Sequence, residues 1–310
     1  MAAKDTKDQK SPSAVMLEAA VSIAVQTGAQ ALFVYCDLDD DLVSLEPGPG
    51  ESYKTVLISQ KKEIEAPSRS QQRYIVRLPD VPLTRMGLVK MATVVSFSQG
   101  ILQAGEPFVF LTGAAGGGLD TILRMTVGQE FELLQTVDQP VLTEHIRRAV
   151  FQRVLNLATS LAAQGREGHA VGALFVLGDS KEVAKVSKQM ILNPFHGYDE
   201  KHRQILDDSM DETIREYSAL DGAFIIRGNG VIESAGTYLR PSMAGDDLPQ
   251  GLGARHATAA AITASTKSIA ITVSQSNGTV RIWRGGTLIT EIEKAQRQPG
   301  SILPGPKADK

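Results

Sequence analysis

The sequence predicts an α/β protein of two domains, an N-terminal one around a doubly wound, mostly parallel sheet and a C-terminal one around a mixed sheet. Three observations lead to this expectation. Helix and strand patterns alternate along the first half, a patternless stretch around Pro140 interrupts them, and glycine-containing tight turns separate short apolar strands in the second half. At 310 residues, the chain is long enough for each domain to bury its own core.

The first half begins with a helix whose start and end are both marked. Pro12 lies between two serines ahead of an apolar periodicity that reaches Val25, and Gly28 follows it. Apolar or alternating runs then predict one long helix at 83–103 and four strands, at 31–36, 53–59, 73–78 and 107–111. Strands that alternate with helices favour parallel pairing through crossover connections.

The second half combines crossover connections with tight turns. Helices are expected at 144–163, 213–220 and 255–267, and strands at 172–177, 224–227, 231–239 and 269–273. The pairs Asn277-Gly278 and Gly285-Gly286 predict hairpins, so the last strands should be antiparallel. We therefore expect domains at 14–140 and 141–295, with disordered tails at 1–13 and 296–310.

Composition narrows the classes of partner and compartment. The net charge is −3 with 22% charged residues, which gives no overall electrostatic footprint for nucleic acid or for an anionic membrane. The single cysteine, Cys36, can form no internal disulfide and begins no zinc cluster, which fits a reducing cytoplasm. The N-terminus lacks the pattern of a signal peptide, and no apolar run reaches the ~20 residues of a membrane span. We expect a cytoplasmic protein.

The glycine-rich stretch 113–118 follows a predicted strand and resembles a phosphate loop only loosely. It lacks the Lys-Ser/Thr ending of a Walker loop and the glycine spacing of dinucleotide-binding loops, so a flexible connection is the favoured interpretation. Core or surface positions are likewise favoured over metal ligation for four histidines without acidic or thiol neighbours at ligand spacing, His145, His169, His196 and His202.

A second glycine-containing segment is a better candidate for binding an anion. Gly251 and Gly253 precede Arg255 and His256 at a predicted helix start, where unpaired N–H groups and positive potential point outward. Arg255 would add a bidentate phosphate donor and His256 a second donor. A solvated helix start with one basic residue explains the segment about equally well.

The pair Asp221-Gly222 also has two interpretations. It can be an everyday turn, because Asp-Gly is common there. It also lies between a predicted helix and an apolar strand, where a carboxylate at the strand edge could meet metal-held phosphates.

Together these segments resemble the diadenylate cyclase domain family. The resemblance covers about the second half of the chain and depends on the order of five short motifs, Gly178-Asp179, Leu220-Asp221-Gly222-Ala223, Tyr238-Leu239, Gly253-Ala254-Arg255-His256 and Val273-Ser274. The N-terminal α/β domain and the segment Asn193–Tyr198 are most similar to archaeal-type cyclases. In those cyclases the first domain is similar to the C-terminal domain of pyruvate kinase, which implies the same doubly wound fold here.

The resemblance also implies roles for individual residues. Asp221 would hold a divalent metal, Mg²⁺ or Mn²⁺, and help activate a ribose 3'-hydroxyl, while Arg255 and His256 would bind phosphate. The other ATP-binding positions that it implies are Leu220, Gly222, Ala223, Tyr238, Leu239, Gly253, Thr258 and Ser274. For Tyr238 and Leu239, a strand tyrosine and a core leucine are nearly as good an interpretation.

The implied reaction joins two ATP molecules into cyclic di-AMP and releases two pyrophosphates, each ribose 3'-hydroxyl attacking the α-phosphate of the other ATP. One site holds one ATP, so the resemblance implies a face-to-face dimer. Two residues depart from the family pattern: Ala257 replaces a second arginine, and Gln275 replaces a metal-binding acid. Because an amide is a poor ligand for a hard cation, a non-catalytic sensor of ATP or cyclic di-AMP is the alternative to the favoured hypothesis of an active enzyme.

Overall fold

The computed structural model of the protein describes residues 11–45, 52–61, 72–114, 118–129, 146–240 and 253–295. Two sheets organise this part of the chain, the first from residues before 130 and the second from residues after 146. None of the helices described combines the length and the apolar character that crossing a lipid bilayer requires.

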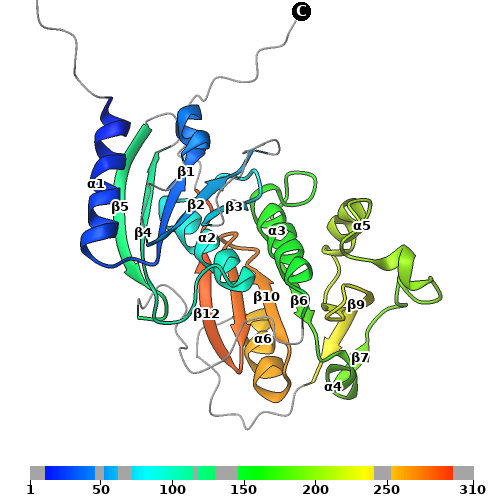
Figure 1. The fold of residues 1–310 in the computed structure, drawn as a ribbon. Coiled ribbons are helices and arrows are strands. Elements are labelled where there is room, and N and C mark those ends of the chain that lie inside the picture. The colour runs from blue at the N-terminus through cyan, green and yellow to red at the C-terminus, as the bar shows by residue number, and fades with distance from the viewer. Residues whose placement is uncertain are drawn as a thin grey trace, which may run out of the picture.

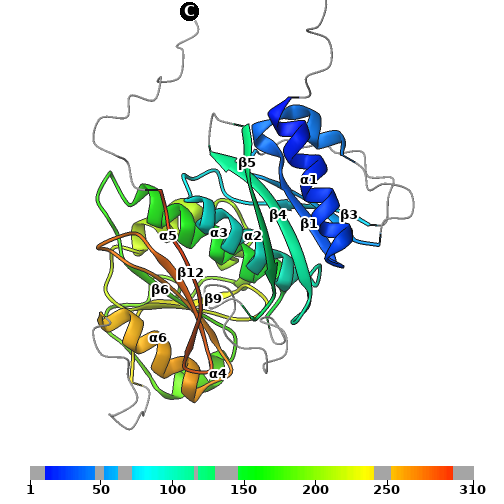
Figure 2. The same ribbon diagram turned by 90° about the vertical axis from the view of Figure 1, so that its left-hand side faces the viewer.

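Helices and sheets alternate in five layers (Figures 1 and 2). Helix α1 (Pro12–Gln26) covers the outer face of the first sheet, and α6 (Ala254–Ser265) covers the outer face of the second. Between the sheets lie α2 (Arg85–Gln99) and α3 (Arg148–Gln164), which pack against each other. Helices therefore cover both faces of each sheet, and both predicted α/β layers are confirmed.

The first sheet has the strand order β3-β2-β1-β4-β5. Neighbours among the first four strands are parallel, and only β5 runs antiparallel to its neighbour. The strands are β1 (Ala31–Tyr35), β2 (Lys54–Ser59), β3 (Arg73–Arg77), β4 (Pro107–Ala114) and β5 (Gly118–Thr126). This confirms the mostly parallel, doubly wound layer.

Helix ends in this half follow local capping chemistry. The Ser11 hydroxyl accepts a hydrogen bond from the Ala14 N–H at 3.2 Å, and the Thr84 hydroxyl accepts one from Gly87 at 2.9 Å. Helix α2 is shorter than the predicted 83–103 because Gly100 takes a left-handed conformation at its end, with φ +75°.

Strand β5 was not expected from the sequence, where 113–118 was interpreted as a flexible connection. In the structure Gly113 pairs with Leu119 and Ala114 with Gly118, so both ends of the stretch belong to a hairpin; residues 115–117 lie outside the described part. A Cβ on Gly113 would lie 1.9 Å from the Gly118 carbonyl oxygen. The glycine is explained by the close approach of two strands.

The second sheet has the order β12-β11-β10-β6-β8-β9-β7, and its only parallel neighbours are β6 and β8. Its strands are β6 (Ala173–Leu177), β7 (Ser187–Gln189), β8 (Ala223–Ile226), β9 (Ile232–Leu239), β10 (Ile269–Val273), β11 (Val280–Arg284) and β12 (Thr287–Ile292). The hairpins predicted at Asn277-Gly278 and Gly285-Gly286 join β10 to β11 and β11 to β12. The remaining helical segments are α4 (Ser180–Lys185), α5 (Met210–Tyr217) and three 3₁₀ turns, η1 (Cys36–Leu38), η2 (Asp40–Ser44) and η3 (Glu200–Arg203).

The two sheets share one buried apolar cluster. It runs from Phe33 in β1 through Met91 in α2 and Phe151 in α3 to Phe175 in β6. Gly87 allows α2 to approach the end of β12, since a Cβ there would lie 2.4 Å from the carbonyl oxygen of Glu293. The layers are therefore packed through a common core.

The division into domains at 14–140 and 141–295 stays a prediction. Its boundary at 140/141 lies outside the described residues, as do the tail 296–310 and residues 1–10 of the tail predicted at 1–13. Helix α1 begins at Pro12, two residues before the predicted start of the first domain.

Candidate active site

One edge of the second sheet gathers most of the candidate residues. Strands β6 and β8 begin there, because they are parallel, and β9 and β10 end there, because Thr237 pairs with Ala223 and Val273 with Ala173. Asp221 and Gly222 lead into β8, Tyr238 and Leu239 end β9, and Ser274 follows β10. Residues separated by more than fifty positions thus meet at a single edge.

Asp221 and Arg255 form an ion pair at this edge. The Arg255 guanidinium, at the start of α6, donates to Asp221 Oδ1 at 3.1 Å. The Asp221 side chain is 86% exposed and that of Arg255 is 30% exposed. An ion pair this open to water contributes only ~0–1 kcal/mol, so Arg255 can readily exchange the carboxylate for another anion.

Arg255 lies against the backbone of a neighbouring strand. A Cβ on Gly172, just before β6, would be 2.8 Å from Arg255 Nη1 and 3.2 Å from the Cβ of Gln275. A side chain at 172 would displace the guanidinium. Gly172 therefore sets the position of Arg255 beside Gln275, although the sequence analysis assigned it no role.

A hollow of about 210 Å³ opens beside Arg255. The residues that line it include Arg166, Glu167, His169, Arg255 and Gln275. The wall therefore carries two guanidinium groups and one carboxylate, that of Glu167. Arg166 also pairs with Glu216 at 2.6 Å. The polar character of the hollow suits an anionic group better than an apolar one.

Gly222 is required by two features of its surroundings. Its φ is +109°, a conformation that side chains strongly disfavour. A Cβ there would also lie 2.6 Å from the carbonyl carbon of Gly236 on β9. This contact fixes the turn that presents Asp221, and Ala223 behind it is buried in the sheet.

His256, the residue after Arg255, is buried in the protein. It is 8% exposed, its ring lies 6.3 Å from that of Trp283, and its Nε2 is 3.0 Å from Arg281 Nη1. Because a guanidinium has only donors, Nε2 must accept, which leaves the proton of the neutral ring on Nδ1. Burial, followed by the cations Arg281 and Arg255, holds the pKa of His256 below its usual range.

The start of α6 leaves backbone donors free of a side-chain cap. Gly253 occupies the N-cap position and has no side chain with which to bond the first N–H groups. His256 Nδ1 lies 3.8 Å from the position that a Cβ would take on Gly253, so the imidazole donor faces the same helix end. The Thr258 hydroxyl instead donates to the Ala254 carbonyl at 2.8 Å. Gly251 lies outside the described residues.

The other predicted positions differ in how open they are. Tyr238 is 47% exposed, with the Arg240 guanidinium 5.4 Å from its ring centre, and Leu220 is half-buried. Leu239 is buried in the apolar cluster under α6. Ser274 is buried, and its hydroxyl lies 3.2 Å from that of Ser276.

A metal site would depend on Asp221 and on a ligand. No group of three or more His, Cys, Asp or Glu side chains is arranged to hold a metal ion in the described ranges. Mg²⁺ in nucleotide sites usually binds one or two carboxylates, phosphate oxygens and water. An exposed carboxylate such as Asp221 fits that donor set.

Gly236 and Arg281 also contact predicted site residues and were not predicted from the sequence. Arg281 and Trp283 alternate along β11 with Val280 and Ile282, which pack toward α3, whereas Trp283 packs under α6. That alternation was a readable signal that Arg281 faces α6. No comparable signal marks Gly236, because its contact with Gly222 depends on strand register.

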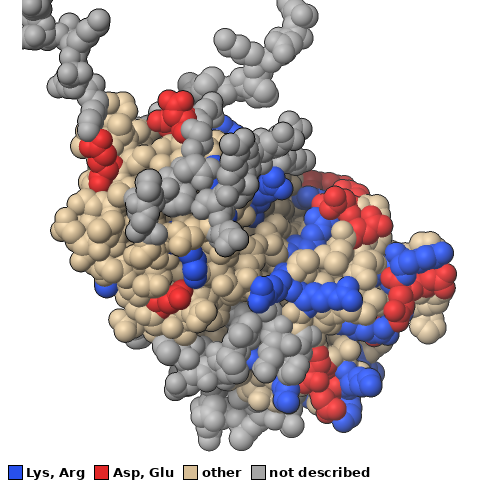
Figure 3. Space-filling model, in the orientation of Figure 1, with Lys and Arg blue, Asp and Glu red and all other residues tan. Residues whose placement is uncertain are grey.

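Charges of both signs lie on the face drawn in Figure 3. Lysine, arginine and acidic side chains are intermingled over the half around the second sheet, while the half around the first sheet carries few of either. This face therefore presents no extended field of one sign, in agreement with the small net charge.

Comparisons with known proteins match both halves of the chain. The family described as "DisA bacterial checkpoint controller nucleotide-binding" matches residues 160–288, and "Probable sensor domain DacZ_P" matches residues 13–135. A diadenylate cyclase of Methanocaldococcus jannaschii is 36% identical over 218 residues, 67% of this chain and 67% of the relative. A diadenylate cyclase of Haloferax volcanii is 34% identical over 239 residues, 77% of this chain and 85% of the relative.

Two solved structures are similar at low identity. DacA from Staphylococcus aureus aligns with 45% of this chain and 83% of its own, at 22% identity and a TM-score of 0.30. A pyruvate kinase from Cryptosporidium parvum aligns with 39% of this chain and 23% of its own, at 12% identity and a TM-score of 0.31.

The edge described above, with its carboxylate, guanidinium and helix start, defines a nucleotide-binding α/β domain, as the description of the matching family says. The identities to the two archaeal relatives extend over two thirds or more of the chain. The chain belongs to the diadenylate cyclase family of enzymes.

Proposed function

We propose that this protein condenses two ATP molecules into cyclic di-AMP and releases two pyrophosphates. The observation that carries the proposal is the exposed Asp221–Arg255 pair at the sheet edge next to the uncapped start of α6. Phosphoryl transfer depends on positioning and charge neutralisation. This edge offers both, because a carboxylate lies in direct contact with a guanidinium that can donate hydrogen bonds to phosphate.

The reaction forms and breaks one bond at each phosphorus. A ribose 3'-oxygen bonds to the α-phosphorus of the other ATP while the bond from that phosphorus to the bridging oxygen of pyrophosphate breaks, and the hydroxyl proton passes to solvent. The exchange happens twice, once for each ATP. Asp221 orients the attacking hydroxyl and would hold Mg²⁺ or Mn²⁺, which when bound neutralises phosphate charge and makes the hydroxyl more acidic.

Arg255 and His256 take different parts in phosphate binding. Arg255 leaves its weak pair with Asp221 and donates to phosphate oxygens. His256 contributes a neutral Nδ1–H, aimed at the helix start by the bond between its Nε2 and Arg281. Gly253, Thr258 and Ser274 line the phosphates in this proposal.

The nucleoside contacts the ends of β8 and β9. Gly222 and Ala223 supply backbone close to it, and Leu220, Tyr238 and Leu239 pack the adenine. Leu239 can do so only from the edge of the core, because it is already buried under α6. Each site holds one ATP, so the active species is a dimer with two sites face to face.

A non-catalytic sensor is the second candidate. Gln275 adjoins Arg255 where the family resemblance places a metal-binding acid, and Ala257 offers no phosphate donor. The match of residues 13–135 to a "Probable sensor domain" is compatible with either candidate. In the sensor, the second region would bind ATP or cyclic di-AMP and the first would transmit the signal.

Replacement of Asp221 by Asn separates the candidates. Purified protein is incubated with ATP and Mg²⁺ or Mn²⁺, and products are identified by mass-resolved chromatography. We expect cyclic di-AMP from the native chain and a loss of at least about 100-fold in Asp221→Asn, since an amide holds a hard cation poorly. Binding of 3'-deoxy-ATP should be largely retained.

Asp120→Asn is the matched control. Asp120 forms a similar exposed pair with Arg85, at 2.7 Å, but on the first sheet. Its replacement should leave turnover unchanged. Nucleotide binding without cyclic di-AMP from the native chain in either metal would favour the sensor, and unchanged turnover of Asp221→Asn would remove that residue from the mechanism.

A further inference from the structure

Exposed apolar side chains gather on one part of the second sheet. Eight large apolar side chains are exposed among the described residues, and six of them lie between 190 and 238. Three are consecutive: Met190 is 53% exposed, Ile191 44% and Leu192 96%. They follow β7 in the lobe farthest from the first sheet, the yellow-green part at the right of Figure 1. A contiguous apolar patch of this kind usually marks a contact surface.

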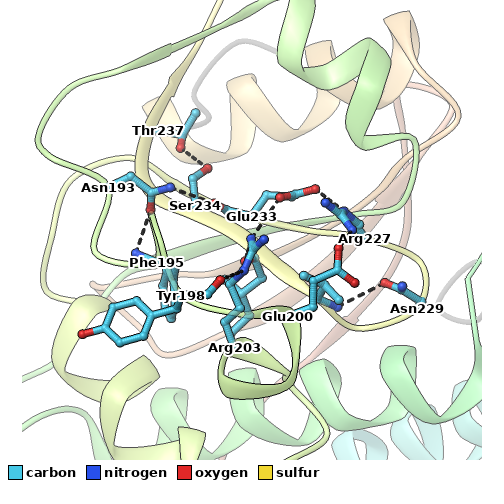
Figure 4. Close-up of polar contacts among 12 residues, drawn as sticks. Asn193, Phe195, Tyr198, Glu200, Arg203, Arg227, Asn229, Glu233, Ser234 and Thr237 are labelled. Atoms are coloured by element: carbon cyan, nitrogen blue, oxygen red, sulfur yellow. Dashed lines mark hydrogen bonds and ion pairs between the residues drawn. The ribbon is translucent and has the colours of Figure 1, made fainter.

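Polar contacts hold the chain at and just after this segment, 190–192, and those of Asn193, Arg203 and Glu233 are drawn in Figure 4. The Met190 N–H donates to the Gly236 carbonyl at 3.2 Å, and the Asn193 amide donates to the Glu233 carbonyl at 2.8 Å and accepts from the Phe195 N–H at 3.1 Å. Arg203 then pairs with the Glu233 carboxylate at 3.1 Å. The apolar side chains are therefore presented by an ordered turn, which reduces the entropy that a partner would have to remove.

Through Gly236, the segment adjoins the sheet edge that carries Asp221. A Cβ on Gly236 would lie 2.7 Å from Ile191 Cγ1 and 3.7 Å from the Asp221 carbonyl oxygen. The same glycine is packed against Gly222. Segment 190–192 and the Asp221 turn thus flank strand β9 on opposite sides. A molecule that approaches Asp221 closely therefore also approaches Ile191.

We propose that segment 190–192 is the apolar centre of the contact between two copies of this chain, and that this contact brings their Asp221 edges together. The inference rests on the proposed function. Two ATP molecules that exchange 3'-hydroxyl and α-phosphate must lie within bonding distance, so the partner edge comes within one nucleotide of Asp221. The adjoining apolar surface is then covered by the partner.

The shape of the patch suits a twofold contact. The exposed Leu192 lies at a shallow hollow of about 860 Å³ that it lines together with Gln189, Met190, Ile191, Asn193 and His196. In a symmetric pair, the Leu192 side chain of each copy can enter the hollow of the other. Three side chains cannot supply the ~800 Å² per partner of a stable interface, so they form its centre, and the surrounding polar side chains form its rim.

Leu192→Asp tests the contact, with Val25→Asp as its control. Both side chains are exposed, Val25 at 60% on α1, so neither change should alter folding. Sedimentation of the full chain over a range of concentrations, with and without 3'-deoxy-ATP, measures self-association. We expect Leu192→Asp to weaken it at least tenfold and to lower cyclic di-AMP formation at low protein concentration, with partial recovery at high concentration and unchanged 3'-deoxy-ATP binding.

Val25→Asp should behave like the native chain in every assay. Leu192→Ser, which adds no charge, should give a smaller effect in the same direction and exclude a purely electrostatic cause. A native chain that stays monomeric at all concentrations, or native-like self-association of Leu192→Asp, would overturn the inference. If Leu192→Asp abolishes self-association but the native chain makes no cyclic di-AMP, the contact stands and the proposed reaction fails.

Discussion

The two sheets of this protein differ in how the polar groups at their edges are paired. In the first sheet the strands β1 and β2 end side by side, at the kind of edge where open parallel sheets usually bind ligands. There Asp37 accepts hydrogen bonds from the Ser59 hydroxyl at 2.5 Å and from the Gln60 N–H at 2.6 Å. The Gln60 amide donates in turn to the carbonyls of Pro79 and Val81. These groups are paired with one another.

The edge of the second sheet is open instead. Asp221 has the guanidinium of Arg255 as a partner but remains 86% exposed, and the first N–H groups of α6 have no side-chain cap. Strand arrangement alone therefore does not determine which sheet edge leaves charged groups available to a ligand. The edge proposed to be reactive is the one where charged groups have weak partners, which a ligand can replace.

Replacement of Phe151 tests whether the two sheets are energetically separate. Phe151 on α3 is fully buried in the cluster that both sheets share, so Phe151→Ala should lower the free energy of unfolding by about 3–5 kcal/mol. Each half carries one natural probe of its unfolding. The single tryptophan, Trp283, lies in β11, and the single cysteine, Cys36, lies beside β1. Burial raises the pKa of the Cys36 thiol to about 11, so labelling should require unfolding.

Coincident transitions distinguish one cooperative core from two independent ones. In urea, Trp283 fluorescence and Cys36 labelling should report the same midpoint, and Phe151→Ala should shift both equally. Val25→Ala, at an exposed position on α1, should change stability by less than about 0.5 kcal/mol. Separate midpoints, or a shift in the Trp283 signal alone, would restore the picture of two domains with their own cores.

A second comparison uses one glycine from each region. Gly28 has φ +64° and no neighbour within 4 Å of a Cβ, so Gly28→Ala should lower stability by the backbone term alone, about 1–2 kcal/mol. Gly222→Ala adds a contact of 2.6 Å with the β9 backbone, which should lower stability by a further ~1–3 kcal/mol and displace Asp221. Urea unfolding and cyclic di-AMP formation measure both.

Activity is the more telling readout of that pair. Gly28→Ala should cyclise ATP at the native rate under native conditions, whereas Gly222→Ala should lose activity even where it is fully folded. Equal activity of the two variants would mean that the turn before β8 tolerates a shift and that the position of Asp221 is not critical.

Much of the fold could be predicted because its signals are local. The serine and proline at the start of α1 and the glycine turns of the last hairpins each specify their structure within a few residues. Strand β5 escaped because it is an edge strand whose exposed positions carry Asp120 and Arg124, which weakens its apolar pattern. The shared core was not predicted because no local signal in the sequence indicates which surface α2 will contact.

The site divides in the same way. Asp221, Arg255 and His256 could be predicted as site residues because their motifs are short and resemble a known family, and the structure places all three at the same sheet edge or helix start. The partners that position them are non-local. Gly172 and Arg281 precede or lie on strands paired with other elements, and only strand register brings them to Arg255 and His256.

His256 should make the free energy of unfolding depend modestly on pH. Since burial and the cations Arg281 and Arg255 lower its pKa in the folded state, the unfolded chain binds a proton at His256 more readily near its ordinary value of 6.5. The unfolded state therefore gains protons first as pH falls, and the stabilisation present above pH 6.5 is lost as pH drops through the lowered folded pKa.

Urea unfolding at pH 7.5, 6.5 and 5.5 should show a steeper loss of stability in the native chain than in His256→Gln. Arg281→Met should also reduce the slope, because it removes one of the cations that disfavour protonation, and the exposed His169→Gln serves as the matched control for loss of an imidazole. An identical slope in the native chain and His256→Gln would mean that His256 is not held neutral by its surroundings, and the donor role proposed for its Nδ1–H would lose its basis.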